Sequence, residues 1–388
     1  MIPADATAPS APVVAVERRL AEMLLDLERL IRCESPTADL DAVARSADLV
    51  AALGAHRLGV DAERIVIDGS THLRWRIGSL DPAAPRLLLL AHHDTVWPVG
   101  SLATHPFSIE DGLVRGPGCF DMLTGLVMAI YAVAELGALS DAAVTLLVTG
   151  DEETGSATSR QLIEQEAVGC VAALVLEASG DGGAFKVGRK GVSNYRIEIA
   201  GRAAHAGLEP ERGLNATVEM GHQIVAVSAC GDAALGTTVT PTVAQGGTTT
   251  NTVAAQASFT VDVRASTAAE QHRVDGVLRS LTSVTGARIE VLGGVNRLPL
   301  EPTWAEPLWR RAVAVAERIR VEPPAAISVG GASDGNFTAS LGIPTLDGMG
   351  AVGGGAHADH EHALVDAIAP RTALLIGLMR DLLSLPDA

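Results

Sequence analysis

The sequence is poor in cysteine, in basic side chains and in long apolar runs. Its 388 residues include four cysteines, and no two of them form a C-x-x-C pair. So few thiols cannot cross-link a chain of this size, and we expect free thiols in a reducing compartment, the cytoplasm. No apolar run approaches the roughly 18 residues of a membrane span. Residues 1–16 lack the basic start and apolar core that an export signal needs, so we expect no export.

The charge is strongly one-sided. Lysine and arginine number 29 against 46 aspartates and glutamates, which gives a formal net charge of −17. A surface this negative repels nucleic-acid phosphates and anionic lipid headgroups, so we expect neither nucleic acid nor a membrane as a partner. An anionic substrate would need a local positive centre, such as a bound metal or a few arginines.

The sequence does contain enough apolar residues for a large core. Hydrophobic residues make up 47% of the chain, and at roughly 150 residues per domain the length predicts about two domains. Three short apolar runs, typical of strands buried on both faces, are Leu87–Ala91, Ala143–Val148 and Val171–Leu176. A helix beginning near Asp121 separates the first two runs. This alternation predicts an α/β sandwich with a mostly parallel sheet.

A different pattern follows from Val192 to about Leu300. Alternating apolar and polar residues predict strands with one solvated face, and a Thr267/Glu270 capping box predicts a helix start. The expected order is strand 192–200, helix 213–229, strand 237–244, strand 252–263, helix 267–285 and strand 287–292. This is the order of a ferredoxin-like α+β unit. We predict a discontinuous catalytic domain, 1–190 and 302–388, with a second domain, 191–301, inserted into it.

Each of the three apolar strands runs into potential metal ligands. His92-His93-Asp94 follows the first strand, Asp151-Glu152-Glu153 the second and Glu177 the third. Ligands bind outside the carboxyl ends of strands in open α/β sheets, so these groups should converge on one rim. One carboxylate after a strand is usually a helix cap or a solvated loop residue. Three such groups together predict a metal site.

Spacing divides the roles within these groups. His92 and Asp94 are two residues apart and face the same side of an extended chain, so Asp94 can accept the spare N–H of a metal-bound His92. His93 faces the other way and is expected to pack. Asp121 follows the turn Gly116-Pro117-Gly118 and is expected to open a helix, where capping and metal binding are compatible.

The acidic pair and a glycine-rich stretch supply the remaining candidates. If Glu153 coordinates metal, the adjacent Glu152 is left to take a proton from a metal-bound water. The stretch 353–362 holds three histidines, and its glycines allow a close backbone approach that favours His357 over His360 and His362. Asp121, Glu153 and Glu177 carry three negative charges, which two divalent ions and a hydroxide would bring near to neutral. A local H-E-x-x-H helix is absent.

Together these residues resemble the dinuclear zinc exopeptidase family that includes glutamate carboxypeptidase, acetylornithine and succinyl-diaminopimelate deacylases, and aminoacylases. The resemblance runs from His92 to His357 and implies a zinc-exopeptidase-like catalytic sandwich with an inserted lid and dimerisation domain. It implies that one zinc is held by His92, Asp121 and Glu177, and the other by Asp121, Glu153 and His357, with Asp121 bridging the two and Glu152 as the general base. Gly201–Gly207 matches the family's G-x-x-x-H-A-G setting, so His205 would reach across a homodimer to stabilise the oxyanion.

Other segments resemble the glutamate carboxypeptidase branch. The turn at Gly116 and the segments around Arg189, Asp262, Asn296 and Gly330 are similar to it. By this resemblance, the substrate's terminal carboxylate would be contacted by Asn251, Arg264 and the Gly331/Ser333 loop, with Arg297 as a further candidate whose alternative is a surface role. An arginine suits a carboxylate because its planar donors form two bonds. Leu123 and Thr124 depart from the lysine and glycine common in the family.

The resemblance implies a hydrolase that releases a C-terminal glutamate or a similar amino acid from a small peptide or N-acyl amino acid. An N-acyl-amino-acid deacylase or a dipeptidase would use the same metal site. Cobalt or manganese could replace the two zinc ions.

Two alternatives come from other protein classes. Gly331–Gly335 fits G-x-S-x-G, with Asp347 and His357 following, so a serine hydrolase using Ser333 is one. That interpretation leaves the metal-ligand candidates without a role. A non-enzymatic binding module is the other, and Glu152 beside Glu153 argues against it because binding alone needs no base.

Overall fold

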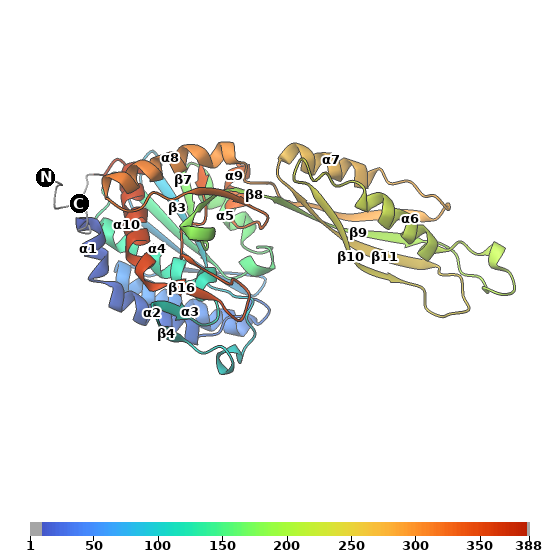
Figure 1. Ribbon diagram of the computed structural model, residues 1–388, viewed down its shortest axis with the longest axis horizontal. Helices are drawn as coiled ribbons and strands as arrows, with labels where there is room; N and C mark the ends of the chain where they lie inside the picture. Colours follow the sequence, from blue (N-terminus) through green and yellow to red (C-terminus); the bar gives the residue numbers. More distant parts are fainter. Residues whose placement is uncertain (1–9, 386–388) are drawn as a thin grey trace. The chain divides into compact units, whose positions relative to one another are not determined.

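The computed structural model describes residues 10–385 and divides the chain into two units. Unit 1 runs up to Val187, resumes over Pro302–Val329 and continues from Ser333; unit 2 comprises Gly188–Glu301 and Gly330–Ala332. The predicted inserted domain, 191–301, falls within unit 2. Residues 1–9 and 386–388 of the predicted catalytic domain lie outside the described range. Figure 1 shows both units, and each is described here by itself.

Unit 1 contains helices and strands from both ends of the chain. Its helices are α1 (Ala11–Glu17), α2 (Leu20–Arg32), α3 (Leu40–Leu58), α4 (Thr124–Leu136), α5 (Arg160–Ala167), α8 (Pro302–Arg318), α9 (Gly335–Ser340) and α10 (Val365–Leu382). Its strands are β1 (Glu63–Ile67), β2 (Ser70–Gly78), β3 (Arg86–His92), β4 (Ser108–Glu110), β5 (Leu113–Arg115), β6 (Ala143–Thr149), β7 (Ala172–Val175), β8 (Phe185–Arg189), β13 (Ala326–Val329), β14 (Thr345–Leu346), β15 (Gly353–Gly354) and β16 (His362–Leu364).

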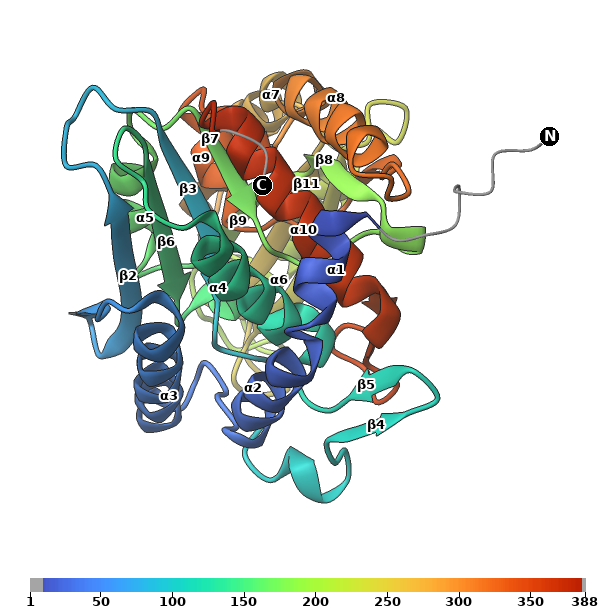
Figure 2. The same cartoon turned by 90° about the vertical axis from the view of Figure 1, so that its left-hand side faces the viewer.

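The main sheet of unit 1 is mostly parallel, as the apolar runs predict. Its six strands have the order β1-β2-β6-β3-β7-β14, in which β6, β3, β7 and β14 run parallel and β2 is antiparallel to both of its neighbours, β1 and β6. Leu88 and Leu90 of β3 join a buried cluster with residues of α5 and Phe337 of α9. Helix α4 packs against β3 and β6, and α10 packs against α4 (Figure 2). Burial on both faces explains why these strands are continuously apolar.

The helix expected near Asp121 begins later, at Thr124. Asp121 lies in the short turn Cys119–Leu123 with φ −118° and ψ 94°, which is not a helical conformation, and the N-terminal end of α4 has no side-chain cap. Asp121 therefore does not cap α4, and the capping prediction is wrong. The segment Cys119–Leu136 is long and apolar enough, by length and composition alone, to cross a membrane, but 83% of it is buried inside the protein, as in a core helix.

A small antiparallel sheet brings the C-terminal region to the Asp121 turn. Its order is β15-β16-β5-β4, with Ala363 of β16 opposite Val114 of β5. The chain from β5 leads into the turn that carries Asp121, and the loop between β15 and β16 carries His357. Two segments far apart in the sequence are thus fixed next to each other.

Unit 2 has the predicted ferredoxin-like order. It consists of β9 (Gly191–Ala200), α6 (Ala216–Ser228), β10 (Thr238–Gly246), β11 (Gln256–Ala265), α7 (Ala268–Arg279) and β12 (Arg288–Arg297). The sheet order β10-β11-β9-β12 is antiparallel throughout. The fold class is confirmed: an α/β unit with a mostly parallel sheet and a separate unit with an antiparallel sheet.

Several boundaries in unit 2 differ from the prediction; for example, β12 ends at Arg297 instead of residue 292 and α6 begins at Ala216 instead of residue 213. Strand β11 begins at Gln256 instead of residue 252, and α7 ends at Arg279 instead of residue 285. After α7 the backbone N–H groups of Val284 and Thr285 donate to the carboxylate of Glu219 on α6, which holds this segment as a loop. Where the chain enters and leaves unit 2, Arg189 and Leu300 exchange two backbone hydrogen bonds of 2.9 and 3.0 Å.

Candidate metal centre

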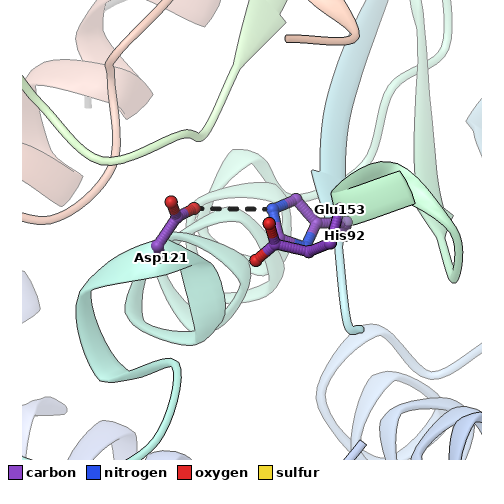
Figure 3. A group of neighbouring side chains, drawn as sticks. All are labelled: His92, Asp121 and Glu153. Carbon is purple, nitrogen blue, oxygen red and sulfur yellow. Dashed lines mark ion pairs between the residues drawn. The ribbon is translucent and has the colours of Figure 1, made fainter. Parts of the chain in front are cut away.

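Three strand ends of the main sheet carry the candidate ligands, as predicted. His92 is the last residue of β3, Glu152 and Glu153 lie in the helical turn after β6, and Glu177 follows β7 by two residues. Because β3, β6 and β7 are parallel neighbours, their carboxyl ends meet at one edge. Figure 3 shows His92, Asp121 and Glu153 pointing toward one another from three different elements.

Asp121 lies between two histidines. Its Oδ1 atom is 3.5 Å from Nε2 of His92, and its Oδ2 atom is 3.4 Å from Nε2 of His357. Glu177 Oε1 lies 3.6 Å from the same nitrogen of His92, and Glu153 Oε2 lies 3.2 Å from the same nitrogen of His357. Each carboxylate oxygen of Asp121 therefore faces a different imidazole, the geometry needed by a residue that bridges two cations.

The donor atoms are close enough to share metal ions. The ligand atoms of His92, Asp121 and Glu153 all lie within 4.8 Å of one another, and so do those of His92, Glu152 and Glu177. Two buried ligand atoms, His92 Nε2 and Glu153 Oε1, have no hydrogen-bond partner among residues 10–385. Buried polar atoms are nearly always bonded, so these two atoms need a partner. Imidazole and carboxylate groups fit a divalent transition metal such as zinc.

The electrostatics of the cluster also favour bound positive charge. Contacts with Asp121 and Glu153 raise the pKa of His357 to about 10. Burial lowers the pKa of His92, but its contacts with Asp121, Asp94 and Glu177 outweigh burial and raise the pKa well above its ordinary value. Burial and the nearby charge of Asp121 raise the pKa of Glu153. The carboxylates thus favour positive charge at both imidazoles, which bound metal ions would supply.

Asp94 supports the cluster through more contacts than its two-residue separation from His92 predicts. The carboxylate accepts the backbone N–H groups of Glu152 and Glu153, at 3.3 and 3.2 Å, and the hydroxyl of Thr37 at 2.7 Å. The Nδ1 atom of His92 is 2.9 Å from the backbone oxygen of Asp94 and 3.5 Å from its carboxylate. The predicted acceptor of the imidazole N–H is the Asp94 carboxylate, but the nearer acceptor in the structure is the Asp94 backbone carbonyl.

Other residues near the cluster have packing roles. His93 is fully buried between the Ser46 hydroxyl and the Thr71 carbonyl, and burial lowers its pKa to about 4, so the ring is neutral. Burial raises the pKa of the Cys119 thiol well above its ordinary value, which makes this thiol inert. The hydroxyl of Thr124 donates to the Cys119 carbonyl at 2.6 Å.

The remaining histidines of the glycine-rich stretch do not join the cluster. His360 is exposed, and the ring of His362 is partly buried with Nδ1 2.9 Å from the His360 carbonyl. His357 has a left-handed backbone with φ 62°, which is uncommon for a residue other than glycine. Its side chain is 49% exposed, whereas that of His92 is 2% exposed.

The predicted oxyanion residue lies in unit 2. His205 is exposed, and its Nδ1 atom accepts the backbone N–H groups of Gly207 and Leu208, both at 3.1 Å. A nitrogen that accepts hydrogen bonds carries no proton in the neutral ring, so the proton is on Nε2. The loop thus presents Nε2–H as a donor.

The substrate-binding candidates of unit 2 differ in exposure. Asn251 and Gly331 are exposed, and Arg264 of β11 is partly buried with its guanidinium 2.9 Å from Asp262. Arg297, at the end of β12, is 5% exposed, so the surface role considered for it does not apply.

Ser333 is buried in unit 1. Its hydroxyl donates to Asp347, and its backbone N–H donates to Asn336 at 3.0 Å. A nucleophile elbow would instead expose the serine oxygen and direct it to a histidine. The structure therefore opposes the serine-hydrolase alternative, and both donors of Ser333 are used inside the fold.

Sequence reasoning did not identify Thr37, Trp97 or Glu361. Thr37 donates to Asp94, as described above. The Glu361 carboxylate accepts from the Trp97 indole and from backbone N–H groups of the Asp121 turn. Glu361 lies in the same stretch as His357, four residues later, but no local pattern indicates that its partners come from the Asp121 turn.

Comparisons with other proteins agree with this architecture. Residues 88–381 match peptidase family M20/M25/M40. The chain is 28% identical to carboxypeptidase G2 of Pseudomonas sp. (strain RS-16), over 92% of this chain and 88% of that protein. It is 26% identical to a succinyl-diaminopimelate desuccinylase of Bradyrhizobium sp. (strain ORS 278), over 90% and 96%. An M20 family metallo-carboxypeptidase of Sulfolobus solfataricus has a similar fold, with a TM-score of 0.74, 17% identity and coverage of 94% and 100%.

Proposed function

Because this chain belongs to peptidase family M20/M25/M40, we propose that it is a dinuclear metallohydrolase that cleaves an amide or peptide bond next to a free carboxylate. The products would be a C-terminal glutamate or a similar amino acid and the remaining acyl or peptidyl part. One observation carries the proposal: the two oxygens of Asp121 face two different histidines, each of which also meets a further carboxylate.

The ligand sets follow from these contacts. One metal would be held by His92, Asp121 and Glu177, and the other by Asp121, Glu153 and His357. Zinc is the proposed metal, with cobalt or manganese as substitutes. When bound, two divalent ions supply Lewis acidity toward a carbonyl oxygen and lower the pKa of a water.

The chain's own residues would handle the proton and the developing charge. Glu152 adjoins the ligand Glu153, and its backbone is fixed by Asp94, so its carboxylate is placed to accept a proton and pass it to the leaving amine. His205 offers its Nε2–H as the donor for the oxyanion. In the proposed homodimer, formed through unit 2, this donor would come from the partner chain.

Substrate recognition is assigned to unit 2 by the resemblance to carboxypeptidases. Arg264, Asn251, Gly331 and Arg297 would contact the substrate's free carboxylate, and Ser333 would support that loop through its bonds to Asp347 and Asn336. The similarity to a desuccinylase favours a second candidate, an N-acyl-amino-acid deacylase with the same metal centre.

We also propose a cytoplasmic location, because the four cysteines are free thiols.

A release assay on zinc-loaded protein tests the substrate class. The panel contains N-acyl and peptidyl conjugates of glutamate, aspartate, alanine and lysine, together with N-succinyl amino acids. We expect glutamyl conjugates to have the highest kcat/KM. Preference for N-succinyl substrates would support the deacylase instead, and hydrolysis of none of these compounds would contradict both candidates.

A further inference from the structure

Glu361 has a fully saturated carboxylate in the interior of unit 1. The side chain is 0% exposed. Its Oε1 atom accepts the backbone N–H groups of Phe120 and Asp121 at 2.9 and 3.0 Å. Its Oε2 atom accepts the backbone N–H of Gly118 at 3.1 Å and the Trp97 indole N–H at 2.7 Å. Four donors occupy the roughly four lone-pair positions that an ionised carboxylate offers.

These four donors belong to segments that carry metal-ligand candidates. Trp97 lies in the loop that follows His92, and the three backbone donors form the turn that presents Asp121. Glu361 itself is joined to His357 by a compact loop, in which Ala358 donates to Gly355 and Glu361 donates to Ala358, both at 2.9 Å. One buried side chain therefore connects the segments of His92, Asp121 and His357.

We propose that Glu361 is a positioning residue of the metal centre, which holds the His357 loop against the Asp121 turn so that their ligand atoms keep metal-binding spacing. This inference rests on the ligand sets proposed above. The bond from the Asp121 backbone fixes the start of the very side chain that would bridge both metals. Because this bond already fixes the Asp121 backbone, the side chain loses less conformational freedom when a metal binds, and the affinity for the metal is higher.

Hydrogen-bond chemistry predicts how Glu361→Gln acts. The substitution keeps the size of the side chain but replaces one accepting oxygen with an NH2 group, which faces two donors and can accept from neither. Changes in groups that orient metal ligands commonly lower metal affinity by about 10–100-fold, and we expect a loss in this range. Affinity is measured by competition between the metal-free protein and a chromophoric zinc chelator.

The matched control is Glu219→Gln in unit 2. Glu219 is also 0% exposed, and its carboxylate also accepts backbone N–H groups, those of Val284 and Thr285. Both variants should lower the stability of the metal-free protein in urea unfolding. Only Glu361→Gln should lower zinc affinity; for Glu219→Gln the change should stay within about twofold, as for independent sites.

Trp97→Phe provides a milder test that spares the carboxylate. It removes one of the four donors and should lower zinc affinity several-fold, less than Glu361→Gln. If Glu361→Gln does not fold, Trp97→Phe decides the question. Unchanged zinc affinity in folded Glu361→Gln would overturn the proposal. If Glu361→Gln does not fold, unchanged zinc affinity in Trp97→Phe would overturn it.

The outcome is separable from that of the proposed function. A parent protein that binds zinc tightly but hydrolyses nothing in the panel would contradict the proposed substrates and leave the role of Glu361 testable by affinity. A parent protein that binds no transition metal would overturn both.

Discussion

Two buried carboxylates, Glu219 of unit 2 and Glu153 of unit 1, have opposite surroundings. In unit 2, Glu219 accepts hydrogen bonds from Gln223, Ser283, Val284 and Thr285. Burial raises its pKa, but these donors outweigh burial and lower the pKa to about 2. In unit 1, Glu153 has a buried oxygen without a hydrogen-bond partner among residues 10–385, and burial raises its pKa. A saturated carboxylate holds a fold together, whereas an unsaturated one indicates a place for a cation.

The largest effect is expected for Glu152→Gln, which changes the proposed general base next to the unsaturated Glu153. The amide cannot accept a proton at neutral pH, so kcat should fall by about 10²–10⁴-fold, the usual contribution of a general base. Zinc content, measured by elemental analysis, should stay at the parent value because Glu152 is not a proposed ligand. Glu317→Gln on the exposed surface of α8 is the control and should match the parent in both measurements. Full activity in Glu152→Gln would contradict its role as the base.

Metal removal tests the unsaturated cluster directly. Chelation should abolish activity and lower the stability of unit 1, because the charged groups around Asp121 lose their counter-ions. At a free metal concentration of 100 times Kd, the lost stabilisation is about 2.7 kcal/mol. Urea unfolding with and without chelator measures this difference, and added zinc, cobalt or manganese should restore it. Equal stability in both conditions would show that the cluster is satisfied by its own ion pairs.

Acid titration tests the saturated carboxylate. The pKa of Glu219 is about 2 in the folded protein, against an ordinary value of 4.5 that applies to the unfolded chain. The stabilising effect of the ionised carboxylate is therefore complete above pH 4.5 and is lost as the pH falls toward 2. Hydrogen bonds to a charged group contribute about 1.5–3 kcal/mol, and the loss should be of this size. Urea unfolding between pH 5 and pH 3 should show a smaller pH dependence for Glu219→Gln than for the parent. The same slope in both proteins would contradict the assignment.

The sequence predicts the parts of the site that depend on burial and strand ends. The apolar run Leu87–Ala91 locates β3 because both of its faces are covered, and the position of His92 at the end of β3 follows from that. The choice of His357 agrees with the geometry, but for a different reason from the one expected. A Cβ at Gly353 would lie 2.0 Å from the His362 carbonyl, so this glycine is required by the β15–β16 pairing.

The parts that could not be predicted depend on contacts between distant segments. The conformation of Asp121 is set in a turn whose backbone N–H groups donate to Glu361, and no local pattern reveals this pairing. The end of α7 was missed for the same reason: Val284 continues the apolar helical pattern, but the Glu219 carboxylate holds this segment outside the helix. The periodicity of a segment contains no information about a hydrogen-bond acceptor on another element, such as the Glu219 carboxylate on α6.

The backbone pairing of Arg189 with Leu300 has a consequence for modularity. Unit 2 begins and ends beside residues that are paired in space, Arg189 and Leu300. The size of unit 2 therefore does not change the distance between the two points at which it joins unit 1. The cost of closing such a loop grows only slowly with its length. Unit 2 can therefore be lengthened, shortened or exchanged in evolution while its two connections stay where they are.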